Sequence, residues 1–160
     1  MQPRLTLQQA SIAADTTTLR SLDWDRSRFD IEFGLRNGTT YNAFLVRGER
    51  TALIDSSHAK FRGSWIPELQ KLIDPAKIDY LIVSHTEPDH SGLIGDLLDL
   101  NPELEVIGSK VALNYLQSQV HRPCKSRSVK SGDSMELGTN PSSGIEHRFE
   151  FLSAPNLHWP

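Results

Sequence analysis

The chain has 160 residues, a formal net charge of −3 and one cysteine. This length fits one domain or part of one. The charge provides no basic surface, so we expect no binding to nucleic acid. No apolar run reaches the length of a membrane span and no signal-peptide segment opens the chain, so we expect a cytoplasmic protein without membrane insertion. A lone cysteine cannot form an internal disulfide, which agrees with a reducing compartment.

Predicted strands and helices alternate along the chain, which indicates a layered α/β fold. Strands are expected at 5–12, 29–33, 44–46, 52–54, 78–83, 104–107, 126–129, 134–137 and 148–152. Helices are expected at 64–73, 91–100 and 109–120, where apolar residues recur at helical spacing, with Ser109 as a cap. The dipeptide Asn37-Gly38 predicts one hairpin turn, and the segment 47–50 predicts a second. The segment 139–145, rich in Pro, Ser and Gly, predicts a surface loop.

The most informative segment follows the apolar strand at 78–83 and reads Ser84-His85-Thr86-Glu87-Pro88-Asp89-His90. It places two imidazoles and two carboxylates within six residues, with no Lys or Arg between them. Burying such a cluster without a cation is costly, because charged groups lose their hydration. The pattern therefore predicts a metal site, with ligands from His85, Glu87, Asp89 and His90, in a strand–loop–helix setting where α/β proteins often bind ligands.

The spacing of these four residues also predicts their geometry. In an extended segment alternate side chains share a face, so His85, Glu87 and Asp89 are expected to point one way. Pro88 supports this, because the residue before a proline avoids helical angles. His90 would then face a second direction beside Asp89. This arrangement predicts two neighbouring sites, one with His85 and Glu87 and one with Asp89 and His90.

The donor atoms of the motif narrow the choice of metal. Imidazoles and carboxylates without thiolates suit iron, manganese or zinc. Glu87 adds negative charge and a hard oxygen donor, which favours iron. A zinc hydrolase, in which a metal-bound hydroxide attacks the substrate, remains one alternative. A chain without catalysis, which only folds or pairs with a partner, is the other.

Residues outside the motif are expected to have other roles. Asp55 is expected to be structural or to orient a ligand. His58, which follows a strand, is expected to be solvated, with an orienting role near the site as the alternative. His121 is expected at a helix end, where its interaction with the helix terminus is favourable. His147 is expected on the surface of a strand, and Cys124 is interpreted as incidental.

The order His-x-Glu-x-Asp-His resembles the metal motif of the metallo-β-lactamase superfamily in its non-haem di-iron variant. The flanking segments make the chain similar to the N-terminal part of a flavodiiron protein. These segments are 37–46, 51–55, 85–93 and 156–160. The pattern Trp24-Asp25-Arg26 before Arg28-Phe29-Asp30 is most similar to the diflavin flavoproteins of oxygenic phototrophs.

The resemblance implies a metallo-β-lactamase-like αββα sandwich, of which residues 1–160 would form the first half. It implies that His85, Glu87 and His158 bind one of two non-haem iron ions, and that Asp89 and His90 bind the other. It also implies reduction of dioxygen, or of nitric oxide, as an electron sink in photoprotection. Electrons would come from NAD(P)H through FMN bound in a flavodoxin-like domain.

The family pattern also requires a bridging aspartate, a final histidine, and flavodoxin-like and flavin reductase domains, which this sequence does not contain. We therefore expect a partial di-iron domain that does not turn over with NAD(P)H by itself. Half of a sandwich leaves one sheet face and one strand edge uncovered, and such surfaces drive association. The sequence thus predicts a homo-oligomer.

Overall fold

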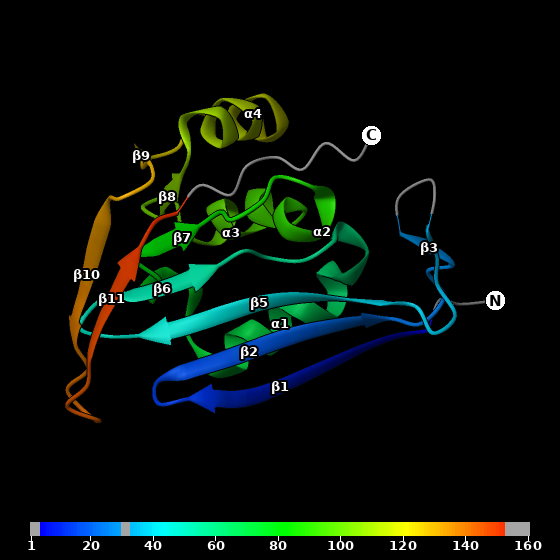
Figure 1. Ribbon diagram of the computed structural model, residues 1–160, viewed down its shortest axis with the longest axis horizontal. Coiled ribbons are helices and arrows are strands. Elements are labelled where there is room, and N and C mark those ends of the chain that lie inside the picture. The colour runs from blue at the N-terminus through cyan, green and yellow to red at the C-terminus, as the bar shows by residue number, and fades with distance from the viewer. Residues whose placement is uncertain (1–3, 30–32, 153–160) are drawn as a thin grey trace.

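The structure, a computed structural model, describes residues 4–29 and 33–152, and the fold within these ranges is built on a seven-stranded sheet (Figure 1). The strands lie in the order β1 (Leu5–Ala13), β2 (Thr16–Asp23), β5 (Thr39–Arg47), β6 (Thr51–Ile54), β7 (Tyr80–Ile82), β8 (Glu105–Gly108) and β9 (Ser126–Ser128). The first four are antiparallel neighbours, whereas β6 to β9 run parallel to one another. Parallel neighbours need crossover connections, and the helices of this fold provide them.

Helices cover one face of the sheet. They are α1 (Arg62–Leu72), α2 (Pro88–Ser91), α3 (Ile94–Leu100) and α4 (Lys110–Val120), with short 3₁₀ turns η1 (Ala59–Phe61) and η2 (Pro75–Lys77). Trp65 and Leu69 of α1 and Leu97 of α3 are buried against Leu53 and Leu81 of the sheet. This packing fixes the position of β7, and of the loop that follows it, relative to the helices.

A hairpin of β10 (Ser134–Thr139) and β11 (Glu146–Glu150) packs on the opposite face of the sheet. Successive side chains of a strand point to opposite faces. Leu53 and Leu81 therefore face the helices, whereas Ala52 and Ile82, one position away, join Met135 of the hairpin in a second core. The hairpin is thus the beginning of a second layer.

The sequence predicted most elements but misplaced two. A continuous strand at 29–33 is wrong: β3 (Arg28–Phe29) and β4 (Phe33–Gly34) pair with each other instead. The hairpin predicted at Asn37-Gly38 is also wrong, because β5 pairs with β2 and β6 and not with β4. Gly38 does have a left-handed φ of 73°, but it serves to bring the backbone against the carbonyl group of Asp23.

Other differences concern single elements. Strand β2 has no counterpart in the prediction. The helix predicted at 91–100 is two helices, because α2 begins earlier, at Pro88. Helix α4 does carry the predicted cap, since Ser109 Oγ accepts a hydrogen bond of 3.1 Å from the Ala112 backbone N–H. Among the described residues, no helix combines the length and apolar character needed to span a bilayer.

Candidate metal centre

The predicted metal motif lies where β7 ends and α2 begins. Glu87 has extended backbone angles, as expected for a residue before proline, and Pro88 occupies the first turn of α2. Asp89 and His90 therefore lie on a helix rather than in an extended loop. The prediction that Asp89 alternates with His85 and Glu87 on one face is wrong, because proline restrains the residue before it and favours a helix after it.

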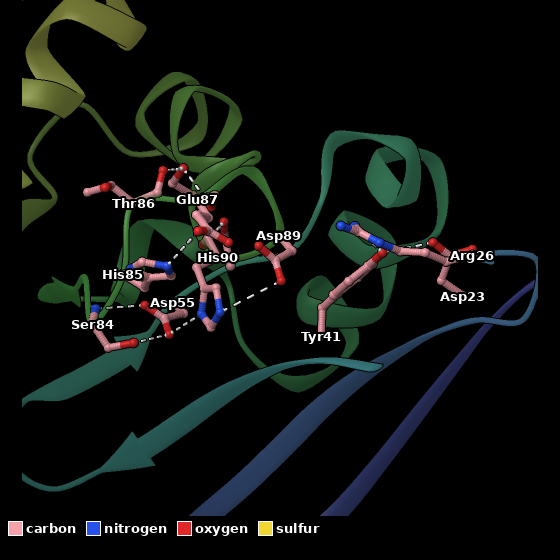
Figure 2. Close-up of polar contacts among 12 residues, drawn as sticks. Asp23, Arg26, Tyr41, Asp55, Ser84, His85, Thr86, Glu87, Asp89 and His90 are labelled. Atoms are coloured by element: carbon pink, nitrogen blue, oxygen red, sulfur yellow. Dashed lines mark hydrogen bonds and ion pairs between the residues drawn. The ribbon is translucent and has the colours of Figure 1, made fainter. Parts of the chain in front are cut away.

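The structure nevertheless brings the four side chains into two adjacent pairs (Figure 2). His85 Nε2 lies 3.3 Å from Glu87 Oε1, and His90 Nε2 lies 3.8 Å from Asp89 Oδ2. The rings of His85 and His90 are 5.2 Å apart, centroid to centroid, and meet edge to face. The two pairs are those that the sequence predicted, although Asp89 and His90 lie on a helix and not in an extended loop.

Asp55 fixes the orientation of His90. This residue follows β6, is only 3% exposed and has a left-handed φ of 57°. Its carboxylate accepts hydrogen bonds from the Ser84 backbone N–H (2.8 Å), from Ser84 Oγ and from His90 Nδ1 (2.9 Å). A carboxylate of this kind only accepts, so Nδ1 of His90 carries a proton. In the neutral ring, the lone pair of Nε2 is then free to face Asp89.

The same contact governs the protonation of His90. Its hydrogen bond to Asp55 is the main cause that raises the pKa of His90, against the opposing effect of burial. A carboxylate that orients a histidine through Nδ1 is a common arrangement at metal sites, where it fixes the coordinating nitrogen. Of the two roles predicted for Asp55, the structure therefore favours the orienting one.

A second polar cluster lies next to Asp89, on the side away from His85 (Figure 2). It contains Asp23, Arg26, Tyr41 and Lys60, none of which the sequence predicted as site residues. Tyr41 shares the buried face of β5 with Ala43 and Leu45 and so resembles a core aromatic residue, while Asp23 ends β2, a strand that the sequence did not predict. Only their proximity in the folded chain reveals the cluster.

His58 belongs to this region and is not simply solvated. Its Nδ1 accepts a hydrogen bond from the Lys60 backbone N–H at 3.2 Å. Its ring stacks on the ring of Tyr41, with the two centroids 6.1 Å apart. Burial, with help from the charges of Lys60 and Arg26, lowers the pKa of His58. The buried surroundings of His58 therefore favour its neutral form, whereas the contact with Asp55 favours a proton on His90.

The remaining candidates lie away from the motif. His121 ends α4 with a left-handed φ of 54°, at the predicted helix end. The surface assignment of His147 is wrong, because the residue is partly buried and its Nε2 donates to Asp15 Oδ2 at 3.0 Å. Cys124 is a free, half-buried thiol. His158 lies outside the described residues.

The donor pairs can be compared with the demands of a metal ion. Two donors that share an ion at right or tetrahedral angles lie about 2.8–3.6 Å apart. The separation in the His85–Glu87 pair falls in this range, and that in the Asp89–His90 pair is slightly wider. Within residues 4–29 and 33–152, no three His, Cys, Asp or Glu side chains are grouped so as to hold a metal. The described residues therefore fit as pairs of ligands, and each pair needs a further donor.

Comparison with known proteins identifies the fold and the family. The family model for the ODP family beta lactamase matches residues 39–160. The chain belongs to this family. A diflavin flavoprotein A 1 from Synechocystis is 58% identical over 159 residues, which is 99% of this chain and 27% of the relative. Another diflavin flavoprotein of that organism is 62% identical over 160 residues, again covering 27% of the relative. The chain thus spans about a quarter of the length of these relatives.

Solved structures agree with this assignment. A variant of the flavo di-iron protein from Thermotoga maritima matches with a TM-score of 0.82 and 30% identity, over 99% of this chain and 39% of that one. The rubredoxin oxygen:oxidoreductase from Desulfovibrio gigas matches with a TM-score of 0.75 and 32% identity, over 82% of this chain and 33% of that one. The predicted resemblance to flavodiiron proteins and the predicted metallo-β-lactamase-like fold are therefore confirmed for this ODP family chain.

Proposed function

We propose that residues 1–160 form part of a di-iron domain in which His85, Glu87, Asp89 and His90 are iron ligands. His158, outside the described residues, is assigned to the same iron ion as His85 and Glu87. The observation that carries the proposal is the orientation of His90, whose Nδ1 is engaged by Asp55 at 2.9 Å so that Nε2 faces Asp89. This orientation would present the Nε2 lone pair to a metal ion, whereas packing alone does not require it.

The activity that we propose for the longer protein is reduction of dioxygen, with nitric oxide as the alternative acceptor. Support comes from the relatives, which include an oxygen:oxidoreductase and diflavin flavoproteins. Two non-haem iron ions, when bound, supply the electrons and the open coordination positions for this reduction. FMN and NAD(P)H would act in parts of the protein beyond these residues.

The residues of this chain have distinct parts in the proposal. Glu87 and Asp89 supply negative charge and hard oxygen donors, which suit iron. Asp55 keeps the proton of His90 on Nδ1, because its carboxylate is itself held by two hydrogen bonds from Ser84. The His85–Glu87 pair is about half exposed, whereas Asp89 is 8% exposed. The two positions therefore differ in access to water, and the second is the drier.

Metal analysis tests the proposal. The chain would be purified without oxygen, loaded with Fe²⁺, desalted and analysed for iron and zinc. We expect iron to be retained, and to be lost from Glu87→Gln and Asp89→Asn, because an amide is a much weaker ligand than a carboxylate. Glu105→Gln is the matched control, since Glu105 begins β8 and binds Arg127 at 3.0 Å.

Each outcome of this experiment separates the proposed class from its alternatives. Iron that persists in Glu87→Gln and Asp89→Asn would refute the ligand assignment. Retention of zinc in preference to iron would favour a hydrolase of the same superfamily. A chain that holds neither metal would favour a non-catalytic role.

Sedimentation analysis of the metal-loaded chain would test the association that we also propose, since a monomer would contradict it.

A further inference from the structure

Three polar side chains next to the candidate metal centre form a directed chain of hydrogen bonds. Arg26 Nη1 donates to the hydroxyl oxygen of Tyr41 at 3.0 Å, and the Tyr41 hydroxyl donates to Asp23 Oδ2 at 2.8 Å. Lys60 contacts the same carboxylate oxygen of Asp23. Asp23 and Tyr41 are 3% and 2% exposed, so their polar atoms depend on these contacts rather than on water.

Tyr41 holds the guanidinium group of Arg26 in place. Its ring packs between His58, which it stacks against, and Phe61, which it meets edge to face. The hydroxyl therefore has little freedom, and because it donates to Asp23 it offers its lone pairs to Arg26. Burial raises the pKa of Tyr41 to about 12, which keeps this donor protonated at physiological pH.

Asp89 is the acidic group that this arrangement faces. Its carboxylate is almost completely buried, and His90 Nε2, at 3.8 Å, is beyond hydrogen-bond distance. Figure 2 shows the Arg26 side chain extending between Asp23 and Asp89. The hydrogen bond to Tyr41 is the main cause that raises the pKa of Arg26, and the charges of Asp89 and Asp23 raise it further. The guanidinium end of Arg26 therefore lies on the side of Asp89 (Figure 2), where the two opposite charges attract each other without a direct ion pair.

From this geometry we propose that Arg26 is a positioning residue that balances the charge of Asp89 in the metal-free chain and opposes the second metal ion. This inference rests on the proposed function. A carboxylate buried without metal needs a nearby positive charge, because desolvation is otherwise costly. When a cation binds Asp89, the fixed guanidinium becomes a like charge and lowers the affinity of that position. Arg26 therefore stabilises the empty site at the expense of metal binding.

A double-mutant cycle in the absence of metal tests the pairing of Arg26 with Asp89. Thermal midpoints of the whole chain would be measured in EDTA for wild type, Arg26→Gln, Asp89→Asn and the double variant. We expect Arg26→Gln to lower the midpoint when Asp89 is present and to have a smaller effect, by about 2–4 °C, in the Asp89→Asn background. Equal shifts in both backgrounds would overturn the proposal. Arg20→Gln, which removes an exposed Arg bound to Asn42, should shift both backgrounds alike.

A Co²⁺ titration followed by the visible absorption spectrum tests the effect on the metal. We expect Arg26→Gln to bind the more weakly held Co²⁺ at least about threefold more tightly than wild type. The affinity of Arg26→Lys, which keeps the charge, and that of Arg20→Gln should differ from wild type by less than about threefold. Tyr41→Phe should tighten binding to a smaller extent, because it removes one of the hydrogen bonds that hold Arg26 without removing the charge.

The outcomes of the two experiments are distinct. Affinity in Arg26→Gln that is unchanged or weaker than wild type would overturn the role toward the metal. Absence of any Co²⁺ binding by the wild-type chain would overturn that role together with the proposed function. The thermal cycle, which needs no metal, would still decide whether Arg26 and Asp89 are paired.

Discussion

Replacement of Asp55 by Asn provides a sharp test of how the candidate centre is organised. Asn is isosteric with Asp and tolerates the left-handed φ of 57° at this position. Its amide oxygen can still accept from the Ser84 backbone N–H. Its NH₂ group, however, would face His90 Nδ1 at the place where the carboxylate now accepts at 2.9 Å. His90 would then accept at Nδ1 and carry its proton on Nε2, where it cannot coordinate a metal.

The expected effect is large on metal binding and small on folding. Loss of a residue that orients a histidine ligand typically costs about 10–100-fold in metal affinity. The hydrogen bonds persist in neutral form, so the free energy of unfolding should fall by only about 1 kcal/mol, the difference between charged and neutral hydrogen bonds. Co²⁺ titration gives the affinity, urea unfolding gives the stability, and ¹⁵N chemical shifts of the His90 ring report its tautomer.

Asp79→Asn is the matched control, because it makes the same change in the loop before β7, where Asp79 Oδ1 binds Arg50 at 2.8 Å. Its metal affinity should match that of wild type. Wild-type affinity in Asp55→Asn, together with a His90 ring protonated on Nε2, would refute the assignment of Nε2 as the coordinating atom. A large loss of stability instead would show that Asp55 acts chiefly in folding.

Two further predictions concern the rest of the fold. The hydrogen bond from His147 chiefly lowers the pKa of Asp15, so the stability that this contact provides is present at neutral pH and is lost as the pH falls through the folded pKa. Thermal midpoints of Asp15→Asn should therefore lie below those of wild type at pH 7 and converge with them below about pH 4; a constant gap would contradict this. Gly38→Ala should lower the free energy of unfolding, measured in urea, by at least about 2 kcal/mol, because φ is 73° and a Cβ would lie 2.0 Å from the Asp23 carbonyl oxygen. Gly63→Ala is the control and should not destabilise the chain, because the space around Gly63 is open.

The sequence predicted well that the motif follows the end of a buried strand, because this information is local. The apolar run before Ser84 requires a buried strand, which ends at Ile82, and Pro88 marks where the next helix begins. The residues between them must then leave the sheet together. The extended conformation predicted for Asp89 failed for an equally local reason, because Pro88 starts α2 instead of prolonging the loop.

The neighbourhood of the motif was less predictable because it is assembled from distant segments. Asp23 ends a strand whose run of Thr residues gave no alternating signal, and its partner Lys60 lies 37 positions further along the chain. The alternation of its strand predicts His147 on the surface, yet the folded chain brings Asp15 into contact with its ring. Pairings of this kind depend on which strands become neighbours, which periodicity alone does not determine.

The hairpin of β10 and β11 has a consequence for how the chain reaches its native state. Its side-chain contacts with the first half join residues far apart in sequence: Asn140 Nδ2 donates to the Arg47 carbonyl across 93 positions, and Ser143 contacts Asp15 across 128. The antiparallel ribbon from β1 to β6 pairs mostly with near neighbours, so its contact order is low and it should form first. During synthesis on the ribosome, the loop that carries His85 to His90 would therefore be in place before this hairpin closes over the back of the sheet.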